Sequence, residues 1–500
     1  MIAFLKKIQN ALQPENLEAK SQLHRKLIIF FCGALSTLAL QPFGAWPLFL
    51  IAFSIFYLFF LFVQSKKQAF IYGWLFGFGY FVFGLNWIGN ALLVNGNEFW
   101  WAWPFAVVAL PIALSIFTGI GTLLAFIIHQ KSKLCLFYLL CIFLSLSEFA
   151  RGFLFTGFPW NLYGHIWIDV PLIAQSASLF GAYGLTFTTL LLSGIPIALI
   201  LGWKQNKTLW LGQLSLLIVL IAYGAYQLNK PQDYNQQTQV QVVQPNIKQA
   251  DKWNPVKLAE NFEKHVSLSA PQEDASRLPT MVIWPETAIS PPLLNSIAAQ
   301  QRIKQMLGQH PKGSTLVSGA LIATTNLEGD IEYTNSVIRF DQDGFYQTLY
   351  SKSHLVPFGE YIPFQNLIPL KTVTNFSGFA RGQGPETIQD DVFGSFSPFV
   401  CYETIFAHKV ANHEEVPEWL LNVTNDAWYG NSPGPYQHLA QSRFRAIEQG
   451  LPFVRSANTG ISSIISPTGE IKASLALSEQ GLIVSKLSEN FKRTVYSRFG

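Results

Sequence analysis

Apolar runs long enough to cross a membrane are the feature that most constrains how this chain folds. A helix needs ~20 residues to span a hydrocarbon core of ~30 Å, and most of the runs before residue 230 are long enough. They lie at 27–42, 46–63, 69–90, 103–129, 133–150, 183–203 and 208–227. We therefore predict about seven transmembrane helices within residues 27–230. The first two runs are short and share the turn "LQPFGAWP", so a re-entrant hairpin is an alternative for them.

Composition and charge agree with a membrane protein and argue against a nucleic-acid partner. Half of the residues are hydrophobic and only 13% are charged, which is unusual for a water-soluble chain. The net charge is +4, and the lysines and arginines are scattered or flank the apolar runs instead of forming one basic face. Cys32, Cys135 and Cys141 fall in apolar runs, so Cys401 has no disulfide partner within its own region.

The charged residues between the runs predict the orientation of the helices, because Lys and Arg resist translocation. Basic residues precede the first run and occupy every second loop after it: Lys6, Lys7, Lys20, Arg25, Lys26, then Lys66, Lys67, then Lys131, Lys133, then Lys204, Lys207. The alternate loops, at 43–45, 89–102 and 151–182, contain Arg151 as their only Lys or Arg. We expect residues 1–26 to be cytoplasmic and the chain to leave the last of these helices on the outer side.

A change of composition after residue 230 predicts a second domain over residues 231–488. The polar linker "PQDYNQQTQ" leads into short apolar runs such as "TMVIWPE", "STLVSGAL" and "EWLLNVTND". These runs alternate with helix-like segments at 255–268, 293–308 and 436–449, a pattern typical of an α/β layered fold. The sequence contains no zinc-type Cys/His pair and no Walker loop, so we predict neither a metal nor a cofactor.

Three ionisable side chains follow predicted strands, where α/β domains tend to carry their catalytic groups. Glu286 ends "VIWPE", Lys352 lies in "LYSKSHLVPFGEY", and Cys401 ends "FVC". A thiol needs to lose its proton to attack a carbonyl, a carboxylate can accept that proton, and an ammonium can stabilise the thiolate and an oxyanion. Each residue taken alone also has an ordinary structural explanation, as a buried thiol, a loop carboxylate or a surface lysine.

The motifs "WPE", "K…HLVPFGEYIP", "CYE" and "NDAW", in this order, resemble those of the nitrilase superfamily. Together with the apolar runs, "GLNWI" at 84–88 and "TGFPW" at 156–160, they make nearly the whole chain similar to the apolipoprotein N-acyltransferase family, the membrane-embedded branch of that superfamily. The resemblance implies an αββα sandwich for the second domain, which would lie outside the cytoplasm. Members of the family carry a further membrane helix after this domain, so the segment 489–500 would lead to a helix that the given sequence does not include.

The same resemblance implies roles for individual residues. Cys401 would be the nucleophile, Glu286 the general base, and Lys352 the residue that stabilises the thiolate and the oxyanion. Four more residues would support the site or contact the acyl donor: Glu360, Tyr402 and Glu403 in support, and Trp253 at the donor. For each of these four, packing or a structural hydrogen bond is the alternative explanation.

The reaction that the resemblance implies is acyl transfer between two membrane-bound substrates. A phospholipid would give its acyl chain to Cys401, and the thioester would pass it to the α-amino group of the S-diacylglyceryl-cysteine that begins a prolipoprotein. The protein would be a multi-pass protein of the bacterial inner membrane with a periplasmic catalytic domain. Two alternatives remain: a membrane-tethered nitrilase-type amide hydrolase, and a non-catalytic receptor or transporter that uses the outer domain for binding.

Lipid access to the site leads to one more expectation. Exposing an acyl chain to water costs ~0.8 kcal/mol per CH₂, so the active site should open toward the membrane. We expect the apolar side chains of Trp253 and of the segment "IPFQNLIPL" at 362–370 to form the entry rim.

Overall fold

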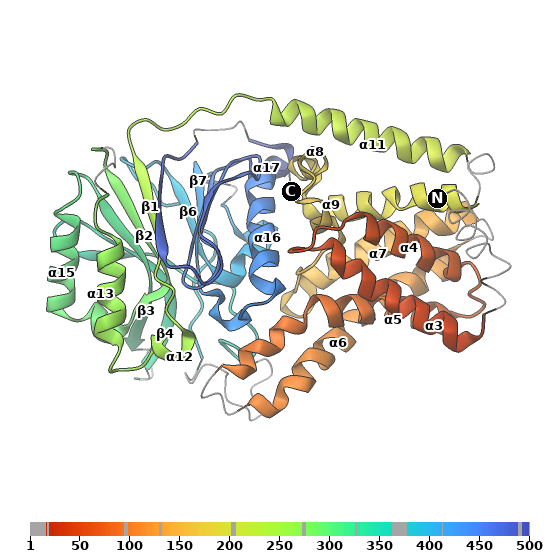
Figure 1. Cartoon of the computed structure of the whole chain (residues 1–500), viewed down its shortest axis with the longest axis horizontal. Coiled ribbons are helices and arrows are strands. Elements are labelled where there is room, and N and C mark those ends of the chain that lie inside the picture. The colour runs from red at the N-terminus through yellow and green to blue at the C-terminus, as the bar shows by residue number, and fades with distance from the viewer. Residues whose placement is uncertain are drawn as a thin grey trace. The chain divides into compact units, whose positions relative to one another are not determined.

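The computed structural model forms two compact units. It describes residues 17, 20–94, 99–129, 133–201, 207–272, 277–325, 329, 331–362, 378–412, 414–488 and 493–499. The helical unit comprises residues 1–89 and 102–230, and the sandwich unit comprises residues 90–101 and 231–500. Figure 1 shows the helices of the first unit and the mixed helices and strands of the second.

The helical unit is built from the apolar runs identified in the sequence. Its α-helices are α3 (Gln22–Ser36), α4 (Pro47–Phe60), α5 (Lys66–Gly84), α6 (Trp103–Ile128), α7 (Lys133–Phe153), α8 (Pro171–Ala174), α9 (Ala177–Leu192), α10 (Gly194–Leu201) and α11 (Lys207–Leu228), and the 3-10 helix η2 (Asn86–Leu93) follows α5. Each predicted run falls on one or two of these helices.

Four of the described helical stretches are long and apolar enough to cross a membrane: Trp100–Ile128, Leu134–Thr156, Ala177–Leu199 and Trp210–Leu228. The pair α5 and η2, bent by 43°, would be a fifth. Helices α3 and α4 have only 15 and 14 residues, short of the ~20 that a straight span requires. The count of seven spans therefore stays a prediction, and so does the re-entrant alternative for the first two runs.

A buried ion pair corrects the assignment of Arg151 to an outer loop. Arg151 lies in the last turn of α7, is 1% exposed, and pairs with Glu148 one turn earlier. Its guanidinium also donates hydrogen bonds to the carbonyl oxygens of Phe158 and Trp160 in the "TGFPW" segment. Arg151 is thus a helix residue that holds the segment after α7, and the remainder of the 151–182 stretch contains neither Lys nor Arg.

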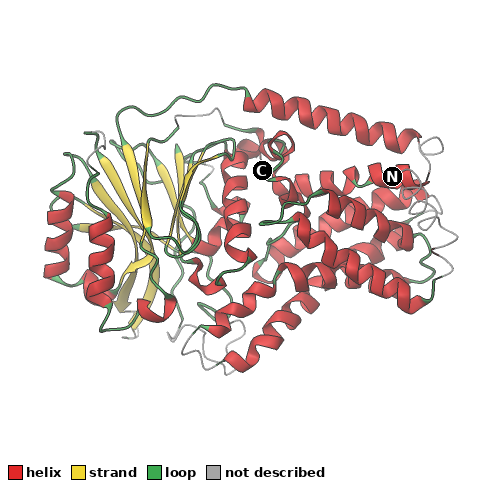
Figure 2. Cartoon of the chain, in the orientation of Figure 1, coloured by secondary structure: helices red, strands yellow, loops and turns green. Residues whose placement is uncertain are grey.

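The sandwich unit contains two β-sheets packed face to face (Figure 2). The strands are β1 (Gln239–Gln244), β2 (Thr280–Ile289), β3 (Thr315–Thr325), β4 (Ile331–Phe340), β5 (Tyr346–Ser351), β6 (Phe396–Val400), β7 (Trp419–Thr424), β8 (Phe453–Ala457), β9 (Ser463–Ile465), β10 (Ile471–Ser474) and β11 (Gly481–Ser485). Their order is β11-β1-β2-β3-β4-β5 in one sheet and β10-β9-β8-β7-β6 in the other. β1 to β3 and β6 to β8 are parallel, so their carboxyl ends lie at a common edge within each sheet.

Helices cover the outer faces of both sheets, which confirms the predicted αββα sandwich. Figure 1 shows α13 (Leu258–Leu268) and α15 (Ile297–Leu307) on one side and α16 (Pro433–Gln449) on the other. Alternation along β2 explains the layering: Ile283 joins the core between the sheets, whereas Trp284 packs with Phe262 of α13 and Ile303 of α15. The shorter helices are α12 (Gln249–Lys252), α14 (Pro291–Leu294) and α17 (Val495–Phe499).

Candidate active site

The structure brings Glu286, Lys352 and Cys401 together in one buried site. Glu286 lies in the last part of β2, Lys352 directly follows β5, and Cys401 directly follows β6. The three residues are 7%, 1% and 7% exposed, respectively. Lys352 Nζ lies 3.9 Å from Glu286 Oε1, and the charges of both residues act on the Cys401 thiol. The fold therefore brings these three residues together, which the sequence alone could not show.

A bulge in β2 directs Glu286 out of the regular strand. The pairing of β2 with β3 changes register between Trp284 and Ile289, and Thr287 adopts a positive φ of 49°. Gly319 on β3 lies directly against the bulge, where a Cβ atom would sit only 2.5 Å from the Cα of Glu286. The absence of a side chain at Gly319 thus lets the backbone that carries Glu286 approach its neighbour.

Cys401 occupies a sharp turn between β6 and the 3-10 helix η6 (Cys401–Ile405). Its φ of 50° lies in the left-handed region, which costs a non-glycine residue about 1–2 kcal/mol. The side chain belongs to the core cluster between the sheets. Strained backbone is a recurring property of functional sites.

A second carboxylate, Glu360, completes the charge network around Lys352. Lys352 Nζ donates to Glu360 Oε1 at 2.9 Å, closer than its 3.9 Å separation from Glu286. Asn335 on β4 donates from one amide nitrogen to Glu286 Oε1 at 2.7 Å and to Glu360 Oε1 at 3.2 Å. The backbone N–H of Val356 donates to the other Glu360 oxygen at 2.8 Å. Glu360 therefore holds Lys352 in place, and Asn335 links the two carboxylates.

Glu403 ties the loop after β5 to the turn that carries Cys401. Its Oε1 accepts four hydrogen bonds, from the Tyr350 hydroxyl, the Ser353 N–H and hydroxyl, and the His354 N–H, at 2.6 to 3.0 Å. Its Oε2 accepts from the N–H of Val400 at 2.8 Å. The carboxylate thereby fixes the distance between the strand ends that carry the lysine and the cysteine.

Tyr402 contributes its ring at the edge of the site. The ring lies 5.8 Å from that of His354 and 5.2 Å from that of Phe406, the latter edge to face. Glu360, Tyr402 and Glu403 thus all lie beside the three converging residues, Glu360 and Glu403 through hydrogen bonds and Tyr402 through packing.

Burial and charge set the protonation of the site. Burial, together with the charge of Glu286, raises the pKa of the Cys401 thiol to about 12 despite the opposing effect of Lys352. Burial also raises the pKa of Glu286 above its usual value, and Lys352 only partly offsets this. Burial alone would lower the pKa of Lys352, but the carboxylates of Glu360 and Glu286 outweigh it and raise that pKa. The site therefore rests as a neutral thiol beside a permanent ammonium and a carboxylate of raised basicity.

A second polar network lies on the other side of Cys401, between β7, β8 and α16. His438 Nε2 lies 3.2 Å from the Cys401 carbonyl oxygen, and its Nδ1 lies 2.9 Å from Asp426 Oδ1. Arg455 donates to Asp426 Oδ2 at 2.6 Å and to Asn422 Oδ1 at 2.7 Å. Asp426, His438 and Arg455 are each at most 1% exposed. This network supports the backbone of the cysteine turn.

Lys252 is a second buried lysine near the site. Its Nζ donates to the backbone carbonyl of Glu286 at 2.8 Å and lies 5.9 Å from the ring of Trp253. Burial lowers the pKa of Lys252 to about 8, although the nearby charges of Glu286 and Cys401 act in the opposite direction. Lys252 therefore connects the loop of Trp253 to the bulge that carries Glu286.

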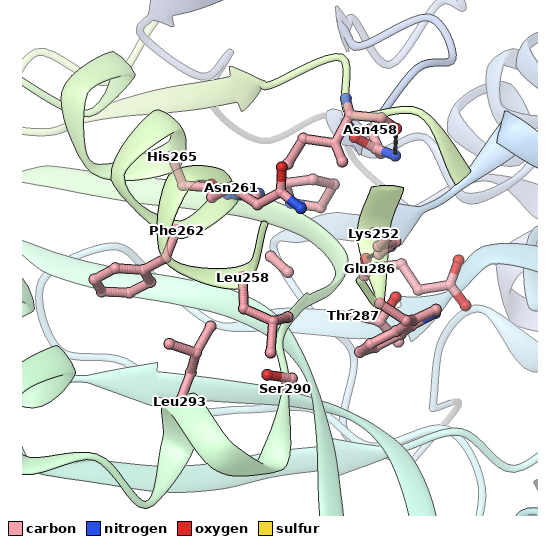
Figure 3. Close-up of a pocket in the computed structure, with 14 residues that line it drawn as sticks. Lys252, Leu258, Asn261, Phe262, His265, Glu286, Thr287, Ser290, Leu293 and Asn458 are labelled. Atoms are coloured by element: carbon pink, nitrogen blue, oxygen red, sulfur yellow. Dashed lines mark hydrogen bonds between the residues drawn. The ribbon is translucent and has the colours of Figure 1, made fainter. Parts of the chain in front are cut away.

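Lys252 and Trp253 line a small cavity behind Glu286 (Figure 3). Figure 3 shows the Glu286 carboxylate directed away from Leu258 and Ser290, which lie across the cavity. The volume of about 20 Å³ admits a water molecule and excludes an acyl chain. Trp253 is half buried here. The donor contact expected of Trp253 would thus have to be made on a face other than this cavity.

The expected lipid rim stays a prediction, because its residues 363–370 lie outside the described residues. The site residues that sequence reasoning missed are Lys252, Asn335, Asp426, His438 and Arg455. Asp426 was visible in "NDAW" and Lys252 adjoins Trp253, but the other three carried no local signal. Within the described part of the chain, no group of three or more His, Cys, Asp or Glu side chains could hold a metal ion.

Comparison with known proteins supports both units. A family model of the apolipoprotein N-acyltransferase N-terminal domain matches residues 32–195, and a carbon-nitrogen hydrolase model matches residues 239–494. The apolipoprotein N-acyltransferase of Rhodopseudomonas palustris is 38% identical over 95% of this chain and 92% of its own length. That of Bradyrhizobium diazoefficiens is 38% identical over 95% of this chain and 91% of its own. A solved CN-hydrolase superfamily protein from Xanthomonas campestris covers 50% of this chain and 90% of its own, with a TM-score of 0.36 and 18% identity.

Proposed function

The chain belongs to the apolipoprotein N-acyltransferase family, and from this premise we propose that Cys401 carries an acyl group from a membrane phospholipid to a lipoprotein. The acceptor is the α-amino group of the N-terminal S-diacylglyceryl-cysteine. One observation carries the proposal: Glu286, Lys352 and Cys401 converge in a buried site at three strand ends. The two substrates use the same thiol in turn, so the reaction is ping-pong.

The first step forms the thioester. Because the thiol has a pKa of about 12, it loses its proton to Glu286 as its sulfur attacks the ester carbonyl carbon of the phospholipid. Lys352 faces the developing oxyanion with its ammonium. The carbon–oxygen bond of the ester then breaks, and the lysophospholipid alkoxide leaves with the proton from Glu286. Cys401 is left acylated and Glu286 is again a carboxylate.

The second step transfers the acyl chain to the amine. The neutral α-amino nitrogen attacks the thioester carbonyl, Glu286 accepts a proton from the nitrogen, and Lys352 again faces the oxyanion. The carbon–sulfur bond breaks, an amide forms, and the leaving thiolate takes the proton back from Glu286. An amine attacks a thioester far more readily than water does when the site is dry, and the three residues are almost completely buried.

The proposed location follows from the charges of the loops and from the substrates. The multi-pass chain lies in the bacterial inner membrane with residues 1–26 in the cytoplasm and the sandwich unit in the periplasm. The alternation of basic loops supports this orientation. The raised pKa of Glu286 and the persistent charge of Lys352 support their assignment as base and oxyanion stabiliser.

Intact-protein mass spectrometry tests the proposal directly. Purified protein incubated with phospholipid should gain the mass of one acyl chain on Cys401, and a diacylglyceryl-cysteine peptide should then remove it as the N-acylated product. Cys401→Ala should gain nothing. An unmodified wild-type protein would refute the thioester, and release of free fatty acid or turnover of small amides instead would favour the hydrolase alternative.

A further inference from the structure

Cationic and hydrogen-bonding side chains gather beside the candidate catalytic residues and are not used by the proposed mechanism. We call His354, Tyr361, Arg381 and Lys409 the rim cluster. His354 follows Lys352 by two residues, and Tyr361 directly follows Glu360. The His354 ring lies 5.8 Å from that of Tyr402, the neighbour of the nucleophile. The rim cluster therefore borders the site on the side of the cysteine turn and the loop after β5.

Two hydrogen-bond donors of the rim cluster have no partner within the described part of the chain. Lys409 Nζ lies 2.8 Å from His354 Nδ1, and an ammonium can only donate. His354 Nδ1 is then the acceptor, so Nε2 carries the ring proton. That Nε2 and the Tyr361 hydroxyl are both buried without a hydrogen-bond partner. Buried donors that lack a partner are costly, which indicates that a ligand supplies the acceptors.

The rim cluster carries two positive charges, and the charge of the Glu403 carboxylate acts on Lys409 without a direct ion pair. Neither Arg381 nor Lys409 pairs with a carboxylate among the described residues, and Arg381 lies 5.0 Å over the ring of Tyr361. The nearby carboxylate of Glu403 is already occupied by five hydrogen bonds. Burial, Lys409 and Arg381 lower the pKa of His354 to about 3, so the imidazole stays a neutral donor. Two cations and two neutral donors thus lie near one another, since Arg381 and Lys409 both act on His354 and Arg381 lies over the ring of Tyr361.

This combination fits an anion with several oxygen atoms. A guanidinium and an ammonium provide the charge, and an N–H and an O–H provide direction, which together suit a phosphate group. Of the two lipids in the proposed reaction, only the donor contains phosphorus. In a glycerophospholipid, only the glycerol backbone separates the phosphate from the ester that the thiol attacks, so a phosphate next to the cysteine turn is within reach.

We propose that His354, Tyr361, Arg381 and Lys409 bind the phosphodiester of the phospholipid donor and so select it over uncharged acyl esters. The inference rests on the proposed function, since it names the part of the donor that this surface recognises. It assigns the rim cluster to the first step alone, because the lipoprotein acceptor carries no phosphodiester at its lipidated cysteine.

A binding experiment tests this without turnover. The Cys401→Ala protein is titrated with dihexanoyl phosphatidylmethanol and with dihexanoylglycerol, which differ only in the phosphodiester. Adding Arg381→Gln and Lys409→Met together should weaken binding of the phospholipid about 10-fold to 100-fold, the range for losing charge-assisted hydrogen bonds, and leave dihexanoylglycerol unchanged. Lys304→Met is the matched control, because Lys304 is an exposed lysine of α15 paired with Asp343.

A kinetic experiment uses the same variants with Cys401 intact. The Arg381/Lys409 double variant should form acyl-enzyme more slowly than wild type from limiting dihexanoyl phosphatidylmethanol, and at the wild-type rate from dihexanoylglycerol. Equal losses on both lipids, or no loss on either, would overturn the assignment. If no lipid acylates the wild type, the proposed function fails, whereas the titration of the Cys401→Ala protein still decides whether the rim cluster binds a phosphodiester.

Discussion

Glu286 and Asp426 are both buried carboxylates whose charges act on the thiol of Cys401, yet their surroundings give them opposite properties. Burial dominates at Glu286 and raises its pKa. Burial acts in the same direction at Asp426, but Arg455 and His438 outweigh it and hold its pKa well below the usual range. Burial alone therefore does not set the pKa of a buried carboxylate. How completely the carboxylate is paired with cations decides whether its pKa is raised or lowered.

The geometry of the two networks explains the difference. Asp426 Oδ2 accepts a hydrogen bond from Arg455 Nη2 at 2.6 Å, and its Oδ1 accepts one from the Thr424 hydroxyl at 3.1 Å, so both of its oxygens face donors. Glu286 accepts one hydrogen bond from Asn335, while its nearest cation, Lys352, lies 3.9 Å away and is hydrogen-bonded to Glu360 instead. The proposed mechanism therefore assigns the proton exchange with the thiol to the loosely paired carboxylate, whereas the tightly paired one stays ionised.

Glu286→Gln should produce the largest effect, because it removes the proposed proton acceptor and keeps the shape of the side chain. We expect acyl-enzyme formation to fall by about 10²-fold to 10⁴-fold, the usual contribution of a general base, with little change in the melting temperature. Single-turnover mass spectrometry gives the rate, and wild-type protein carried through the same preparation gives the baseline. An unchanged rate would show that another group accepts the thiol proton.

Asp426→Asn should act on stability instead. Removing one partner of a buried pair leaves Arg455 uncompensated, which typically costs about 3–5 kcal/mol. The thermal unfolding transition in detergent should therefore move to a clearly lower temperature, while the fraction that remains folded should still acylate Cys401. If the variant unfolds like wild type but fails to form acyl-enzyme, Asp426 acts in catalysis and not in stability.

Lowering the pH should affect the roles of the two carboxylates at different pH values. The change expected for each pH unit is smaller than the effect of either substitution. Because the pKa of Glu286 is raised, the base is lost as pH falls through a value above 4.5, and the acylation rate should fall about tenfold per pH unit below it. Protonating Glu286 does not destabilise the fold, since its ionised form is the one that burial disfavours. Asp426 has a depressed pKa, so its stabilising contribution is complete above the unfolded value of ~3.9 and is lost only as pH falls further.

Activity should therefore disappear before the fold does. The measurement pairs single-turnover rates with circular dichroism on the same samples over a descending pH series. Coincident loss of rate and structure would mean that the two carboxylates titrate together and that the contrast between them does not hold.

The elements of the sandwich unit could be predicted from local patterns. Runs such as "TMVIWPE" and "EWLLNVTND" form β2 and β7, and the segment 436–449 lies within α16, because β-branched and amphipathic patterns reflect which face each element buries. The strand predicted before Lys352 is β5, whereas β10 was missed. β10 alternates between exposed and half-buried residues, so it shows no continuous apolar run.

The candidate site could be predicted only where a residue follows a recognisable strand. Glu286 and Cys401 end such strands, whereas His438 and Arg455 lie inside α16 and β8 and reach the cysteine turn only when these elements pack. Asn335 opens an apolar run and gives no sign that it bridges two carboxylates. Contacts between residues distant in the chain depend on register and layer order, which local sequence patterns do not encode.

The positive φ of Cys401 has a consequence for how this activity can be lost over evolutionary time. Glycine adopts a φ of 50° without the penalty that a cysteine bears, so replacing Cys401 with glycine removes a small buried side chain and relieves the backbone at once. These two effects act on the stability of the fold in opposite directions. The backbone of this turn thus favours glycine, and what a cysteine supplies here in return is its buried thiol.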